Sequence, residues 1–86
     1  MEDLVIPERI YEGLIMHCRE EAPYEACGLL AGKGIGVTAA YRLTNAEHSP
    51  VSYIMDSGEQ FMVMKEMRAE GLSMLAIYHS HPASPA

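Results

Sequence analysis

Two histidines one residue apart, His79 and His81, stand at the end of an apolar run in the segment AIYHSHPASPA. Side chains at positions i and i+2 of an extended chain point to the same face, so both imidazoles can be directed at one point. Imidazole nitrogen is a common zinc ligand, although a catalytic zinc site has three protein ligands. The spacing alone therefore leaves two interpretations open, a metal site or two histidines with structural roles.

Glu25, in the segment PYEACGLLAG, is the other candidate for chemistry. A glutamate at the start of a strand is commonly a solvated surface residue. The functional alternative is a general base, because a carboxylate beside a metal can accept a proton from a water molecule whose pKa the metal has lowered. Cys27 faces the same way in an extended chain, and a buried structural cysteine is favoured there over a group that approaches the metal.

Hydrophobic periodicity predicts the elements that position these residues. Apolar residues at i, i+4 and i+8 predict a first helix that opens at Pro7 and stops before Pro23. A second helix is predicted to begin at Ser57, as the N-cap of a capping box, and to end with Gly71 as its C′ residue. Strands are predicted over residues 25–32, 36–46, 51–56 and 72–79, with a tight turn at 33–36 and a polar loop at 45–50.

This order of elements favours an α/β fold in which a mixed β-sheet is flanked by helices. The strand that ends at His79 is predicted to be buried on both faces, because its apolar run is continuous. A chain of 86 residues supports one modest core, so residues 1–86 are expected to form a single domain.

The composition excludes several classes of protein. The net charge is −6 with only six Lys and Arg, so no basic stripe can follow a nucleic acid, and a protein partner with a basic patch is favoured. Two cysteines are too few for a disulfide-stapled secreted domain. The acidic start is unlike a signal peptide, and no apolar run is long enough to span a membrane. A cytoplasmic location without membrane attachment is the expectation.

The remaining polar and sulfur-containing residues are expected to have ordinary roles. His17 and His48 are predicted to lie on the surface, and Cys18 is predicted to join the apolar stripe of the first helix. The seven methionines are predicted to fill the core rather than to form a binding face.

Glu25 ahead of the run CGLL, with AIYHSHP much later in the chain, resembles the JAMM (MPN-plus, Mov34/MPN/PAD-1) family of zinc metallopeptidases. The resemblance covers about residues 3–86, and the compact spacing is similar to that of bacterial and archaeal members. It implies a cytidine-deaminase-like fold with a central sheet between helices. It also implies that Glu25 is the general acid/base and that His79 and His81 hold Zn²⁺. The implied reaction is hydrolysis of a peptide or isopeptide bond at the C-terminal tail of a ubiquitin-like or sulfur-carrier protein.

The sequence departs from the family pattern after His81. The family motif continues with a serine and then an aspartate, the third zinc ligand, whereas only residues 82–86 follow His81 here. Ser84 comes too early to be the motif serine, and no aspartate follows. An interrupted motif is favoured over an incomplete family member, so the C-terminal part of the fold is expected to be missing and activity impaired.

Two consequences of this departure stay open. An exposed sheet edge would allow the chain to self-associate as a homo-oligomer. The alternative to an enzyme is a non-catalytic MPN-like binding or scaffold module. A zinc deaminase is disfavoured, because its His-x-Glu and Pro-Cys-x-x-Cys signatures are absent.

Overall fold

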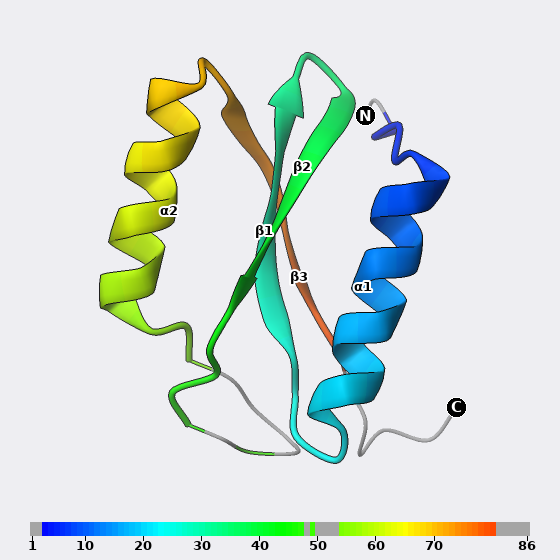
Figure 1. The fold of residues 1–86 in the computed structure, drawn as a ribbon, viewed down its shortest axis with the longest axis vertical. Helices are drawn as coiled ribbons and strands as arrows, with labels where there is room; N and C mark the ends of the chain where they lie inside the picture. Colours follow the sequence, from blue (N-terminus) through cyan, green and yellow to red (C-terminus); the bar gives the residue numbers. More distant parts are fainter. Residues whose placement is uncertain (1–2, 48, 50–53, 81–86) are drawn as a thin grey trace.

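A three-stranded sheet between two helices is the architecture of the protein. The computed structural model describes residues 3–47, 49 and 54–80. Along the chain come α1 (Glu8–Glu21), β1 (Cys27–Lys33), β2 (Gly36–Leu43), α2 (Ser57–Ala69) and β3 (Ser73–His79). The strand order is β2-β1-β3 and both pairs are antiparallel. Figure 1 shows α1 and α2 on opposite sides of the sheet, which confirms the predicted α/β class.

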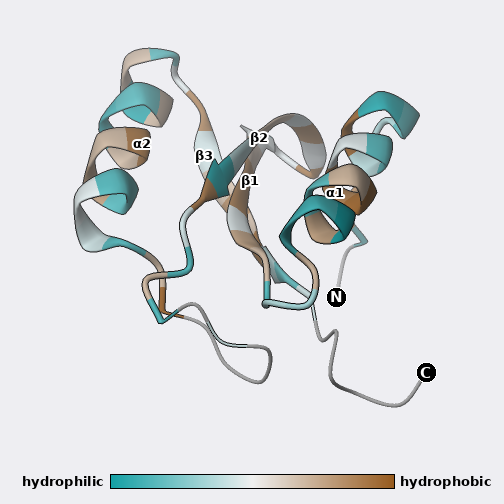
Figure 2. Ribbon diagram, turned by 60° about the horizontal axis from the view of Figure 1, so that its bottom comes forward, coloured by the Kyte–Doolittle hydropathy of each residue, from teal (hydrophilic) through white to brown (hydrophobic). Residues whose placement is uncertain are grey.

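The central strand β1 carries most of the core. Its first six residues are all buried, and Leu29 is fully buried. Alternate residues of β1 face α2 and pack with Met67 of that helix, in a cluster that comprises Cys27, Leu29, Ala31, Leu43 and Met67. Figure 2 shows that hydrophobic residues gather in the sheet, whereas hydrophilic and hydrophobic residues alternate along both helices. Among the described residues, no helix is long and apolar enough to cross a membrane.

The prediction that the strand ending at His79 is buried on both faces is wrong. That strand, β3, lies at an edge of the described sheet, and none of its residues is fully buried. Ile77, in its middle, is 49% exposed. A continuous apolar run marks a strand of the core, but only the pairing order decides which strand is central, and here β1 has both neighbours.

α2 begins at Ser57, as predicted, but its N-cap differs from the prediction by one residue. The N-cap is Asp56 rather than Ser57, because the Asp56 carboxylate accepts a hydrogen bond from the Glu59 backbone N–H at 2.9 Å. The Glu59 carboxylate accepts from the backbone N–H of Thr44 at 2.6 Å and from its hydroxyl at 2.7 Å. These bonds fasten α2 to the end of β2. Gly71, with φ of 72°, follows the helix in the left-handed conformation, as predicted.

The segment between β2 and α2 forms less strand than predicted. β2 ends at Leu43, and of the predicted strand over 51–56 only residues 54–56 are described. Within these, Met55 forms an isolated antiparallel bridge with Asn45. The backbone groups around Asn45 are therefore bonded within a loop rather than to the sheet.

Candidate functional site

Glu25 lies two residues before Cys27, the first residue of β1, on the face of the sheet that α2 covers. Its side chain is only 2% exposed, so it is not the solvated surface glutamate of the simpler interpretation. Its backbone N–H donates to the carbonyl of Ser49 at 2.8 Å, and its own carbonyl accepts from the Asn45 Nδ2 at 3.1 Å. A buried carboxylate requires polar partners, since burying a charge without them is costly.

His79 supplies one such partner. Its Nδ1 lies 2.9 Å from Glu25 Oε1, and the imidazole remains 32% exposed while the carboxylate is 2% exposed. Because the two residues belong to different strand ends, the pairing of β1 with β3 brings them together. The contact shows that Glu25 and His79 lie side by side; that they form a catalytic and metal-binding site stays a prediction.

The register that creates this contact is fixed at the strand ends. Cys27 pairs with His79, so their side chains lie on the same face. One residue further, the Ser80 backbone N–H donates to the Ala26 carbonyl at 3.0 Å. The Ala26 backbone N–H in turn donates to the Ser80 hydroxyl at 2.8 Å. A slip of one residue would turn His79 to the opposite face, and these bonds oppose it.

The orientation of His79 is suited to metal binding. Because Nδ1 is bonded to the Glu25 carboxylate, this imidazole would coordinate a metal ion through Nε2. Histidine ligands of metal sites commonly pair their second nitrogen with a carboxylate in this way. His81 lies outside the described residues, as do His48 and Ser84. Within residues 3–47, 49 and 54–80, no group of three His, Cys, Asp or Glu is placed to hold a metal ion.

Cys27 shares the face but has a structural role. It is fully buried, and its thiol donates to the Leu43 carbonyl over 3.7 Å. Burial raises the pKa of the Cys27 thiol to about 11. Because metals bind the thiolate, a thiol that resists ionisation is a poor ligand. The structure therefore supports the prediction of a buried structural cysteine.

Sequence reasoning missed a polar pair on the opposite face of the sheet. His17, predicted to lie on the surface, is 5% exposed, and its Nδ1 lies 2.7 Å from the Tyr78 hydroxyl. Burial lowers the pKa of His17 and raises the pKa of Tyr78 to about 12. Tyr78 pairs with Gly28 across the strands, where the absence of a side chain leaves room for the ring. The pair fastens α1 to the strand that ends in His79.

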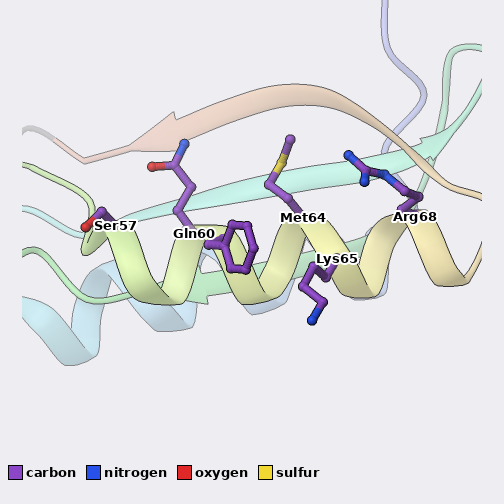
Figure 3. A pocket seen from close by; sticks show the side chains of 6 residues that line it. Ser57, Gln60, Met64, Lys65 and Arg68 are labelled. Atoms are coloured by element: carbon purple, nitrogen blue, oxygen red, sulfur yellow. The ribbon is translucent and has the colours of Figure 1, made fainter.

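An open pocket of about 540 Å³ lies along α2, and none of its lining residues is Glu25 or His79. Figure 3 shows Gln60, Met64 and Arg68 projecting from one side of the helix, with Lys65 on another side. Met64 is 37% exposed, in contrast to the prediction that methionines fill the core. That prediction holds for Met67, which is 2% exposed.

Comparison with known proteins shows the family to which this chain belongs. Residues 7–86 match the model of a family described as prokaryotic homologues of the JAB domain. The chain belongs to this family, as the resemblance in its sequence implied.

Individual relatives agree with this assignment. The CysO-cysteine peptidase of Mycobacterium tuberculosis is 42% identical over 86 residues, which cover 96% of this chain and 58% of the relative. A protein of Thermus thermophilus, named as a TtuB-protein conjugate cleaving protease, is 40% identical over 84 residues, 96% of this chain and 56% of its own length. The solution structure of protein DSY2949 from Desulfitobacterium hafniense superimposes with a TM-score of 0.83 at 41% identity, covering 94% of this chain and 58% of that one. The chain thus spans somewhat more than half the length of the proteins it matches.

Proposed function

We propose that the protein is a zinc-dependent peptidase that cleaves the amide bond at the C-terminal tail of a ubiquitin-like or sulfur-carrier protein. The observation that carries the proposal is the contact between the buried Glu25 carboxylate and His79 Nδ1. The names of the relatives support it, because they refer to a CysO-cysteine peptidase and to cleavage of TtuB-protein conjugates.

The donor chemistry at His79 fits zinc. An imidazole whose Nδ1 is bonded to a carboxylate has a fixed orientation and a more basic Nε2, which favours coordination. His79 and His81 are the proposed ligands from this chain, the latter by its spacing of two residues along the sequence. A further ligand is required, since catalytic zinc sites have three from the protein.

The proposed mechanism uses Glu25 for proton transfer. Zinc held by His79 and His81 would polarise the scissile carbonyl and would lower the pKa of a water molecule to about 7. Glu25 accepts the proton of the attacking water at a carboxylate oxygen and delivers it to the nitrogen of the leaving amine. The burial of Glu25 excludes bulk water from the carboxylate, which strengthens its interactions with the reacting groups. His79 and Glu25 also hold one another in position.

The test is hydrolysis by the full-length protein that the gene encodes, supplied with zinc. The substrate is a carrier protein with one amino acid amide-linked to its C-terminus, and mass spectrometry reads the loss of that residue. Glu25→Gln removes the proton acceptor at nearly constant volume and is expected to lower kcat by at least about 100-fold. Bound zinc is expected to be retained.

The matched control is Glu66→Gln, the same chemical change at an exposed position of α2. It is expected to leave kcat unchanged. Full activity of Glu25→Gln would remove Glu25 from the mechanism. No hydrolysis by the wild-type protein with zinc bound would reject the proposed function in favour of a binding module.

A further inference from the structure

We infer that Asn45 is a positioning residue that fixes Glu25 for proton transfer; the inference rests on the proposed function. Asn45 lies two residues beyond Leu43, the last residue of β2. Its link to the chemistry is the backbone of Glu25, to whose carbonyl its side-chain amide donates a hydrogen bond of 3.1 Å.

The Asn45 side chain joins two parts of the loop to Glu25. Asn45 is only 4% exposed, so water does not compete for the hydrogen bonds of its amide group. Its Oδ1 accepts from the backbone N–H groups of Glu47 at 3.0 Å and Ile54 at 3.1 Å. One amide group therefore ties both sides of the loop together while its Nδ2 holds the Glu25 carbonyl.

Glu25 depends on this arrangement because it precedes the strand. β1 begins at Cys27, and Ala26, the residue before it, bonds to Ser80, the residue after β3. The Glu25 backbone bonds to Asn45 and Ser49, which belong to the loop and not to a strand. The carboxylate can face His79 only while its own backbone is held in one orientation, so the loop controls the geometry of the site.

The chemistry of an amide makes this role separable from the folding of the loop. Asparagine offers a donor and an acceptor on the same planar group. Asn45→Asp keeps an oxygen to accept from Glu47 and Ile54, but it sets a carboxylate oxygen against the Glu25 carbonyl. That variant loses the bond to Glu25 and retains the loop bonds.

The matched control is Thr44→Val, at the preceding position. It removes the hydroxyl that donates to Glu59, a bond that runs to α2 and not to Glu25. Both variants disturb the end of β2 by one side-chain group of similar size. A difference between them therefore reports on the link to Glu25.

The experiment measures kcat, KM and zinc stoichiometry of the full-length protein, with the amide hydrogen exchange of Glu25 as an independent readout. Asn45→Asp is expected to lower kcat about 10–100-fold, the usual cost of losing a group that orients catalytic residues, with KM and zinc content unchanged. The Glu25 amide is expected to exchange at least 10-fold faster in Asn45→Asp, and Thr44→Val to match wild type in both readouts. If Asn45→Asp fails to fold, Asn45→Ser takes its place. A single hydroxyl cannot bond the Glu25 carbonyl and the backbone N–H groups of Glu47 and Ile54 at the same time.

Equal kcat for Asn45→Asp and Thr44→Val would overturn the inference while leaving the proposed function intact. A parallel fall in kcat and rise in KM in both variants would also overturn it, because that pattern signals a general loss of structure. If the wild-type protein hydrolyses nothing, the proposed function fails and the catalytic role of Asn45 fails with it. The exchange rate then still decides whether Asn45 fixes the Glu25 backbone.

Discussion

Replacing Gly28 with alanine would place a methyl group where the sheet has no space for one. The added Cβ would lie 2.3 Å from Cε2 of Tyr78 and 2.4 Å from the backbone oxygen of Tyr41. The Tyr78 ring can tilt away, but the Tyr41 oxygen belongs to the backbone of β2, which pairs with β1. The substitution therefore forces either the pairing of β1 with β2 or that with β3 to shift.

The magnitude follows from two contributions. Overpacking a close-packed interior costs about 1–3 kcal/mol. Displacing the Tyr78 ring also weakens its hydrogen bond to His17, which contributes about 1 kcal/mol. We expect Gly28→Ala to lower the free energy of unfolding by about 2–4 kcal/mol, which for a domain of this size lowers Tm by at least about 8 °C.

The assay is equilibrium unfolding in urea, followed by circular dichroism. The matched control is Gly13→Ala, in the interior of α1, where an added Cβ meets nothing within 4 Å. It should stabilise the protein by about 0.5–1 kcal/mol, because alanine loses less backbone entropy in a helix. The double variant Gly28→Ala/Tyr78→Ala should not restore stability, since the contact with the Tyr41 oxygen remains. A Gly28→Ala protein as stable as wild type would refute the packing described at this pair.

Three other predictions concern stability and reactivity. Burial, with help from a nearby arginine, lowers the pKa of His17 in the folded state, so the unfolded chain binds this proton more readily. The protein therefore keeps the full contribution of His17 to its stability above the unfolded pKa of about 6.5 and loses that contribution as the pH falls below that value. Between about pH 7 and pH 5, the Tm of wild type should fall more steeply than the Tm of His17→Gln. Parallel curves for the two proteins would contradict the burial of a neutral His17. Burial raises the pKa of the Cys27 thiol to about 11, so iodoacetamide at neutral pH should modify only the half-buried Cys18 in the native protein. In urea it should modify both thiols, as read by mass spectrometry. Equal modification rates of Cys18 and Cys27 in the native protein would refute the burial of Cys27. Asp56→Ala should lower the free energy of unfolding by about 1 kcal/mol, because it removes the N-cap of α2. An equal loss of unfolding free energy in Ser57→Ala would instead identify Ser57 as the N-cap.

The sequence predicted the elements well where local signals were strong. Both helices, the glycine after α2 and the turn at 33–36 follow from periodicity and from residues with special backbone freedom. The sequence could not distinguish the central strand from the edge strand, because β1 and β3 are both apolar and periodicity does not report pairing order. It placed the N-cap at Ser57 instead of Asp56, since both residue types cap helices and stand side by side.

Only part of the candidate site was predicted, because contacts between distant segments are not visible in the sequence. Glu25 and His79 were singled out by residue type and motif, and the register of β1 with β3 explains why they meet. Asn45 carried no signal, because an asparagine in a polar loop is ordinary turn chemistry until its partner is known. The burial of His17 was missed because it depends on Tyr78, which is distant in the sequence, and local sequence patterns do not report such an interaction.

Zinc binding tests the central claim most directly. The measurement is the zinc content and affinity of the full-length protein at neutral pH, for wild type, His79→Ala and His81→Ala, with His17→Gln as the control histidine on the other face of the sheet. The account predicts one zinc per chain in wild type and in His17→Gln, and loss of tight binding in both alanine variants. Zinc retained by His79→Ala with unchanged affinity, or no zinc bound by the wild-type protein, would contradict it.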